Sequence, residues 1–113
     1  MRNDDAYLLD LLVAARKAAT YAEGLTYERF AASDLHQNAI LKVLEIVGES
    51  AARISDDTKT AHPRIPWPNI VGFRNWVVHV YFDIDLDMVW KIVNEDVPSL
   101  IRELERIVPP EDR

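Results

Sequence analysis

Residues 27–54 form the longest periodic run of the chain and read YERFAASDLHQNAILKVLEIVGESAARI. After an opening gap, apolar residues recur at steps of three, four or seven, which is the spacing of one face of an α-helix. They are Phe30, Ile40, Leu41, Leu44, Val47, Ala51 and Ile54. A glycine inside a helix costs about 1 kcal/mol relative to alanine, so we expect Gly48, with Ala51 and Ala52, to let another helix approach closely. The run predicts a long helix over 27–54.

The segments on either side of this run have patterns of their own. Residues 4–22 carry a wide apolar face at helical spacing, Gly24 predicts the end of that helix, and Thr26 suits the N-cap of the next. Residues 55–68 hold three of the six prolines and show little periodicity. They predict a loop.

Two more helices are expected in the C-terminal half. One has Pro68 in its first turn and runs to about Tyr81. The other begins at Asp85 or Asp87, and Pro98 should kink it near the preceding turn. Helices with apolar stripes pack economically as an antiparallel bundle. We therefore predict an all-α fold, an antiparallel four-helix bundle with its last helix kinked near Pro98. It forms one domain over residues 1–113 with a core in residues 5–107.

Composition limits the classes of function. The 113 residues are 49% hydrophobic, carry a net charge of −6 at pH 7 and include no cysteine. An acidic chain is not a general nucleic-acid coat, because phosphate affinity comes mostly from Lys and Arg, so a nucleic-acid role needs a local basic cleft. The lack of cysteine excludes disulfides, thiolate catalysis and Cys-based zinc sites. The N-terminus does not resemble a secretory signal, and no stretch approaches the roughly 18 apolar residues of a membrane span. We expect a soluble cytoplasmic protein with no membrane partner.

The stretch RNWVVHVY, residues 74–81, places ionisable side chains among large apolar ones. On a helix, Asn75 and His79 are four residues apart and lie above one another. Arg74 and His79 are five apart, about 140° around the axis at about 100° per residue. They converge only if the arginine bends across, if the helix distorts, or if a second copy of the helix lies across a two-fold axis.

Plainer interpretations of the same side chains exist. A single histidine on a helix is more often a hydrogen-bonded structural residue than a catalyst. An arginine beside an apolar stripe usually reaches water or pairs with a carboxylate, which Glu45 or Glu49 on the long helix can supply. Tyr81 suits an aromatic core position with its hydroxyl at the surface.

The stretch RNWVVHVY resembles the Arg-x4-His-x-Tyr motif of the HepT-like ribonucleases of the HEPN superfamily. Other segments resemble that family in the same order and cover most of residues 5–107. They are LEIVGESAARIS (44–55), IPWPNIVGFRN (65–75), YFDIDLDMVWKIV (81–93) and VPSLIREL (97–104). One position departs from the pattern, because Val80 stands where the family often has a small or polar residue. The resemblance implies a bundle of the HEPN type.

The resemblance also implies an activity. It implies an endoribonuclease toxin of a type II- or type VII-like toxin–antitoxin pair, which cleaves RNA without metal or other cofactor and leaves a 2′,3′-cyclic phosphate. His79 is the implied acid–base catalyst for the 2′-hydroxyl, and Arg74 the implied donor to phosphate oxygens. Asn75 is expected to orient the imidazole or to donate to phosphate, and Glu49 to support the site as a carboxylate partner. Such sites are usually built between two protomers, so a homodimer is expected.

Tyr81 has a separate implied role. In such pairs the partner is a MntA-like minimal nucleotidyltransferase that adds AMP to this tyrosine. A bulky anionic adduct beside Arg74 repels RNA phosphate and blocks the cleft. We expect Tyr81 to be a modification site and not a catalytic residue.

Other functions stay open at this point. The main alternative is a non-catalytic helical subunit that binds nucleotide, or the partner, for a minimal nucleotidyltransferase; another is a structural bundle dimer. A calcium loop starting at DIDLD, residues 83–87, is not supported, because Met88 and Asn94 stand where an EF-hand needs Gly and Glu. These acids better suit a helix start. The three histidines are scattered, so no metal site is expected.

Overall fold

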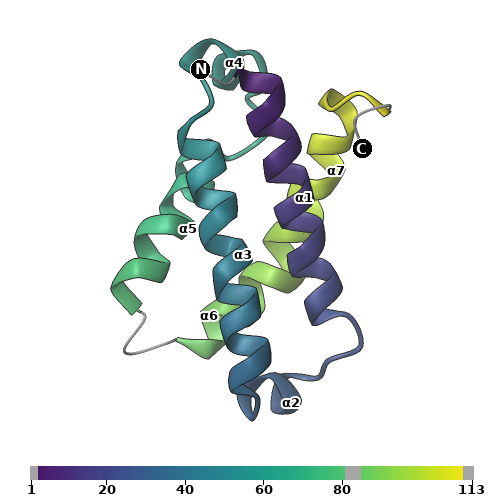
Figure 1. The fold of residues 1–113 in the computed structure, drawn as a ribbon, viewed down its shortest axis with the longest axis vertical. Helices are drawn as coiled ribbons and strands as arrows, with labels where there is room; N and C mark the ends of the chain where they lie inside the picture. Colours follow the sequence, from purple (N-terminus) through teal and green to yellow (C-terminus); the bar gives the residue numbers. More distant parts are fainter. Residues whose placement is uncertain (1–2, 81–84, 111–113) are drawn as a thin grey trace.

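The computed structural model describes residues 3–80 and 85–110, with the backbone alone for residues 74–80. The described residues form seven α-helices and one π-helical turn, and no strand (Figure 1). The helices are α1 (Asp4–Ala22), α2 (Tyr27–Ala31), α3 (Asp34–Ala52), α4 (Asp56–Ala61), α5 (Trp67–Val80), α6 (Leu86–Lys91) and α7 (Val97–Ile107), with the π turn at Ile92–Asp96. The all-α prediction is confirmed. No helix of this part of the chain is both long and apolar enough to cross a membrane.

Polar side chains at the N-termini explain where most helices start. The side chains of Asn3, Thr26, Ser33, Ser55 and Asp85 each accept a hydrogen bond from the backbone N–H three residues later. Each bond satisfies a donor that has no partner within its helix. The predicted caps at Thr26 and Asp85 are confirmed, as is the predicted span of the first helix. Gly24, with a φ of +77°, follows α1 in the left-handed conformation that glycine favours.

The prediction of one helix over 27–54 is wrong, because the chain breaks between α2 and α3. Ser33 caps α3 by accepting from the His36 N–H at 3.2 Å. The buried amide of Gln37 donates to the carbonyl oxygens of Phe30 and Ala31, both at 3.0 Å. These bonds satisfy the carbonyl groups at the end of α2 and stabilise the turn between α2 and α3. The turn lies between Phe30 and Ile40, where the apolar pattern of the sequence is interrupted.

The prediction of a loop over 55–68 is wrong in part, because it contains α4. Asp4 at the start of α1 accepts hydrogen bonds from the Ser55 N–H at 3.1 Å, the Ser55 hydroxyl at 2.5 Å and the Thr58 hydroxyl at 2.5 Å. These contacts hold the N-terminus of α4 against α1. Because α4 has six residues and none of them is buried, its sequence has no periodic apolar residues from which a helix could be predicted.

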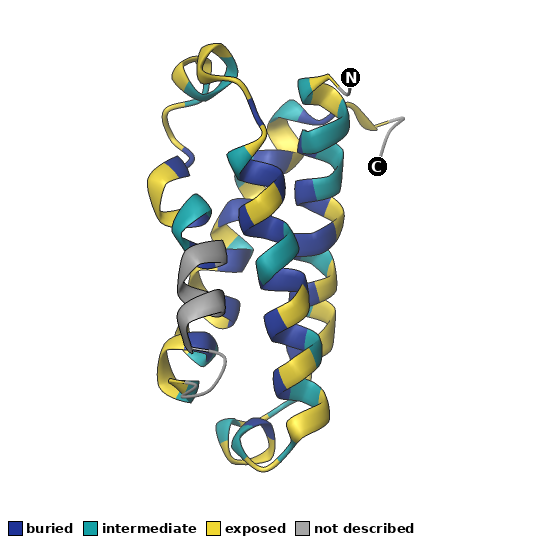
Figure 2. Ribbon diagram, turned by 60° about the vertical axis from the view of Figure 1, so that its left-hand side comes forward, coloured by how far each residue is buried: buried dark blue, intermediate teal, exposed yellow. Residues whose placement is uncertain are grey.

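Four long segments make the body of the molecule. They are α1, α3, α5 and the continuous stretch from α6 to α7, and Figure 1 shows that they alternate in direction. α3 packs between α1 and α5, and α1 also packs against α7. Buried residues line the inner faces (Figure 2). The largest side chains without solvent contact are Phe30, Leu11, Leu12, Ile40, Leu44, Leu104, Val47, Val89, Val93 and Val97.

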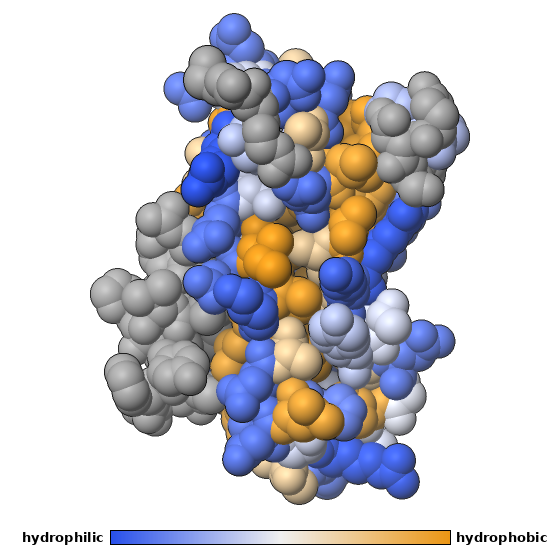
Figure 3. Space-filling model, viewed as in Figure 1, coloured by the Kyte–Doolittle hydropathy of each residue, from blue (hydrophilic) through white to orange (hydrophobic). Residues whose placement is uncertain are grey.

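Small residues are buried where the central helices pack. Ala15, Ala18 and Ala51 are fully buried, and Gly48 is buried on α3, while the close approach of another helix at Gly48 stays a prediction. The outer side of α1 and α3 is mixed, with apolar patches between hydrophilic ones (Figure 3). Leu35 on α3 is the most exposed large apolar side chain of the described residues, at 75%.

The fourth segment is irregular just before Pro98. Ile92–Asp96 form the π-helical turn, and Pro98 lies in the first turn of α7. Because proline has no N–H, the Asn94 carbonyl one turn earlier cannot receive the usual α-helical bond. A widened turn accommodates such a missing bond. The helix therefore departs from α-helical geometry just before Pro98, while the kink predicted there stays a prediction.

Candidate active site on helix α5

The first half of α5 is anchored in the core. Trp67, Ile70 and Phe73 are buried at steps of three residues, which turns one side of α5 towards the bundle. The Trp67 indole N–H donates to the His62 carbonyl at 3.0 Å and ties the helix start to the preceding turn. These contacts set the direction in which the second half of α5 runs.

The second half of α5 carries Arg74, Asn75 and His79. Arg74 and His79 are separated by about 7.5 Å along the axis at about 1.5 Å per residue. At about 100° per residue, positions 74 and 79 of the helix backbone lie about 140° apart around its axis. The side chains of residues 74–80 lie outside the described part of the structure, and Tyr81 lies outside it entirely. The roles given to these four residues stay predictions.

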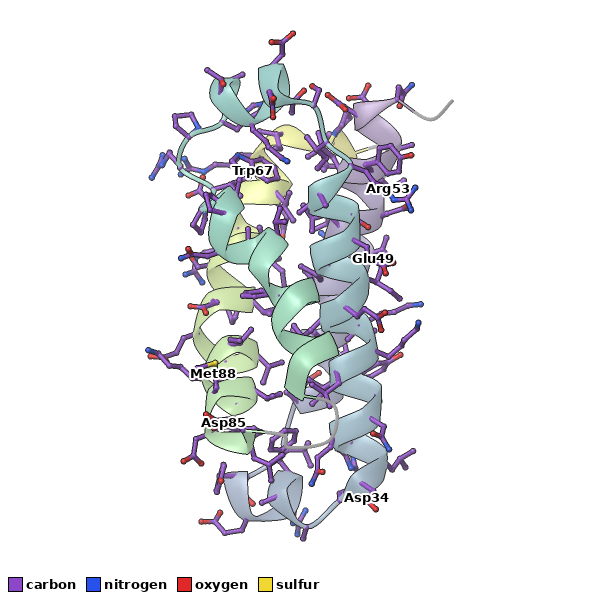
Figure 4. The ribbon with its side chains drawn as sticks, turned by 90° about the vertical axis from the view of Figure 1, so that its left-hand side faces the viewer. Asp34, Glu49, Arg53, Trp67, Asp85 and Met88 are labelled. Atoms are coloured by element: carbon purple, nitrogen blue, oxygen red, sulfur yellow. The ribbon has the colours of Figure 1, made fainter. Side chains whose placement is uncertain are left out.

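Glu49 lies elsewhere within the protomer. It is exposed on α3 and lines a shallow hollow of about 220 Å³ between α1 and α3. The described lining is Tyr7, Asp10, Ile46, Glu49, Ser50 and Arg53. Figure 4 shows Glu49 and Arg53 on the side of α3 turned away from α5. Within the protomer Glu49 is thus turned away from α5, and its support of Arg74 or His79 stays a prediction.

Glu45 is the other carboxylate considered as a partner for the arginine. It is half-buried on α3, and its carboxylate lies 3.8 Å from the Lys42 ammonium. An exposed pair of this kind, three residues apart on a helix, contributes little to stability. Within the described residues, Glu45 has this lysine as its cationic neighbour.

The start of α6 is held close to α2 by a contact that sequence reasoning missed. The Tyr27 hydroxyl donates to the Asp87 carboxylate at 2.5 Å, and this hydrogen bond raises the pKa of Tyr27 above its usual 10.0. Trp90 packs against Phe30 and Tyr27, with ring centroids 5.2 and 6.1 Å apart. Together with the Asp85 cap, these contacts fix the element that follows segment 81–84. Tyr27 and Asp87 are 60 residues apart, so no local pattern pairs them.

Among the side chains that the structure describes, in residues 3–73 and 85–110, no group of three or more His, Asp or Glu residues is placed to hold a metal ion. Metal independence of the predicted reaction stays a prediction.

Comparisons with known proteins give one consistent result. The family model described as "Ribonuclease HepT-like" matches residues 11–107, which include all of α5. A protein of Methanocaldococcus jannaschii named "Putative RNase MJ1380" is 36% identical over 104 residues, which cover 92% of this chain and 95% of the relative. "Probable ribonuclease HepT" of Thermococcus cleftensis is 34% identical over 106 residues, covering 94% and 96%. No solved structure matches the chain.

Proposed function

Because this chain belongs to the HepT-like ribonuclease family, we propose that it is an endoribonuclease toxin acting in the cytoplasm. The observation that carries the proposal is the family match over residues 11–107, which spans the Arg74-x4-His79 motif on α5. The two relatives described above align with this chain over more than nine-tenths of both sequences.

The proposed chemistry needs no metal, because RNA carries its own nucleophile. His79 accepts the proton of the ribose 2′-hydroxyl while the 2′-oxygen bonds to phosphorus. Arg74 holds the negative charge that grows on the phosphate oxygens. The bond between phosphorus and the 5′-oxygen then breaks, and that oxygen takes up a proton. The products are a 2′,3′-cyclic phosphate and a 5′-hydroxyl, with Asn75 orienting the imidazole or donating to the phosphate.

The proposed site is shared between two copies of the chain. Positions 74 and 79 lie about 140° apart around α5, so two antiparallel copies of the helix would bring position 74 of one near position 79 of the other. The same arrangement gathers two Arg74 side chains in one place on a chain whose net charge is −6.

Cleavage of RNA by the purified protein tests the proposal. The wild-type protein, freed of its partner, is expected to cut RNA in the presence of EDTA, and His79→Ala is expected to abolish cutting. His36→Ala is the control, because it removes an imidazole from another helix, α3, where the ring contacts Ser33 at 2.7 Å. If wild type and His79→Ala are equally inert on varied RNAs while both bind ATP or a nucleotidyltransferase, the chain is a binding subunit instead.

Neutralisation is proposed to occur at Tyr81. A MntA-like nucleotidyltransferase antitoxin adds AMP to its hydroxyl, and the anionic adduct excludes RNA phosphate from Arg74. Mass spectrometry of the chain after co-expression with this partner is expected to find adenylate on the peptide that holds Tyr81. Tyr21→Phe is the control, since Tyr21 is an exposed tyrosine of α1. Adenylate found elsewhere, or on no residue, would remove this part of the proposal.

A further inference from the structure

Two adjoining hollows lie where the first turns of α5 meet α7. They share Arg64, Ile65 and Glu103, so a single bound group can extend from one into the other. The first hollow continues along α5 past Asn69 to Phe73, the residue before Arg74. The second hollow lies on the other side of Arg64 and reaches His62 and Arg106.

The first hollow has an apolar floor and a polar rim. Ile65, Ile70, Phe73 and Leu100 form the floor, and all four are buried. Asn69, Asp96 and Ser99 stand at the rim and are exposed. A flat heterocycle needs this combination, because its faces are apolar while its edges need donors and acceptors.

Arg64 lines both hollows and is exposed, so a ligand can reach its side chain. Its guanidinium Nε lies 3.7 Å from the Glu103 carboxylate. A planar guanidinium packs face to face with a nucleobase and also donates to phosphate oxygens. The Glu103 contact involves Nε, so the face of the guanidinium and its two amino groups remain for a ligand.

The charges divide between the hollows. The second hollow is lined by two arginines, Arg64 and Arg106, and by one carboxylate, Glu103, and His62 also lines it. The first hollow is lined by two carboxylates, Asp96 and Glu103, and by one arginine, Arg64. A cationic site suits a phosphate, and a carboxylate at an apolar site suits an exocyclic amino group.

The size of the hollows favours part of a polymer over a free small molecule. Their volumes are about 80 and 160 Å³, whereas pockets that enclose a whole ligand measure roughly 300–1,000 Å³. A nucleotide within a strand is held by its neighbours as well, so a shallow site contributes to its binding.

We propose that these hollows are an accessory subsite for one nucleotide of the RNA strand, with the base over the apolar floor and its phosphate at Arg64 and Arg106. This inference rests on the proposed ribonuclease function and adds a determinant of base preference. Asn69 precedes Arg74 by about 7.5 Å along the helix axis, which places the subsite on the same helix as the proposed catalytic pair. Bases with an exocyclic amino group are preferred to uracil, because Asp96 accepts from such a group.

The test is binding of short 2′-O-methyl oligonucleotides, which lack the nucleophile and cannot be cleaved. Fluorescence anisotropy at low salt is expected to show tighter binding of oligoadenylate and oligocytidylate than of oligouridylate. Arg64→Ala is expected to raise the Kd about fivefold or more through loss of its contact with the phosphate. Arg106→Ala is expected to weaken the binding of all three oligonucleotides equally. It is also expected to reduce by about 1 the slope of the logarithm of the binding constant against the logarithm of the salt concentration. Arg102→Ala, an exposed arginine of α7 that lines neither hollow, is the control with the same loss of charge.

A second pair of variants tests the base preference. Asp96→Asn is expected to reduce the difference in Kd between oligocytidylate and oligouridylate. Glu95→Gln removes the same charge from the neighbouring exposed residue, and it is expected to leave this difference in Kd as in the wild-type protein. Circular dichroism spectra identical to wild type establish that each variant is folded.

The outcomes separate this inference from the proposed function. If wild type binds and cuts RNA while Arg64→Ala and Arg106→Ala behave as Arg102→Ala, the subsite is wrong and the ribonuclease proposal stands. If the variants lose binding to the nucleotidyltransferase and keep oligonucleotide affinity, the hollows are a protein contact and the subsite is overturned. If wild type binds no oligonucleotide at all, the RNA substrate and the subsite both fail.

Discussion

At the scale of single residues, a few polar side chains determine how neighbouring elements meet. Asp4 accepts three hydrogen bonds from α4, Gln37 satisfies two carbonyls at the end of α2, and Tyr27 donates to Asp87. Each joins elements that the apolar pattern leaves unconnected. Within the described residues, no buried side-chain polar atom lacks a hydrogen-bond partner, as a well-packed core requires.

Asp4 provides a prediction about pH and stability. The Ser55 hydroxyl first, then the Thr58 hydroxyl and the Ser55 N–H, lower the pKa of Asp4 below 3.8. A carboxyl whose pKa is lower in the folded state stabilises the fold above its unfolded value, and that stabilisation is lost as pH falls through the folded value. We expect Asp4→Asn to lower Tm at neutral pH and to match wild type well below pH 3.8.

Asp5→Asn is the control for this measurement, because Asp5 lies in the same first turn of α1. Both carboxylates interact favourably with the helix N-terminus. Thermal unfolding is measured for both variants across the acid range. Equal changes in Tm for the two variants would mean that the contacts of Asp4 with α4 add nothing to the stability of the fold.

At the scale of elements, the break between α2 and α3 shows how a local signal overrides an apolar period. Ser33 stands before an acidic residue and a run of good helix formers, which is the pattern of an N-cap. The signal was present in the sequence, but Thr26 offered another cap seven residues earlier. The helical run Asp34–Ala52 that carries most of the predicted apolar positions is confirmed.

Ser33→Ala tests the cap. Loss of the bond to the His36 N–H is expected to lower the free energy of unfolding by about 1 kcal/mol, and Ser33→Gly by only a few tenths. Urea unfolding followed by circular dichroism measures both. Ser99→Ala is the control, because Ser99 is exposed within α7. If the Ser33→Ala protein is as stable as the Ser99→Ala protein, the cap contributes no stability, and Gln37 alone stabilises the turn between α2 and α3.

At the scale of the whole molecule, the bundle positions α5 along one flank of α3, with its first half buried and its second half carrying the motif. A shared site then predicts complementation between inactive variants. Arg74→Ala and His79→Ala are each expected to be inactive alone. Mixed after unfolding and refolding together, they form dimers in which one of the two sites keeps both residues, so about a quarter of wild-type activity returns.

The mixing experiment distinguishes two arrangements of the site. If Arg74 and His79 of one protomer act together, a mixed dimer has no complete site and activity stays absent. Sedimentation of the mixture and of each variant alone is the control, because it shows whether dimers form. A monomer that cuts RNA at full rate would contradict the shared site.

The sequence by itself determined the all-α class, the span of α1, the cap at Thr26, the helix start near Asp85 and the likeness to the HepT-like family. These features are encoded within a few residues of one another, through apolar period, capping and motif order. Only the tertiary structure decided that Asp4 holds α4, that Tyr27 holds α6, and that Glu49 faces the hollow beside α1. Such contacts join residues more than 30 positions apart, and their geometry exists only once the helices have packed.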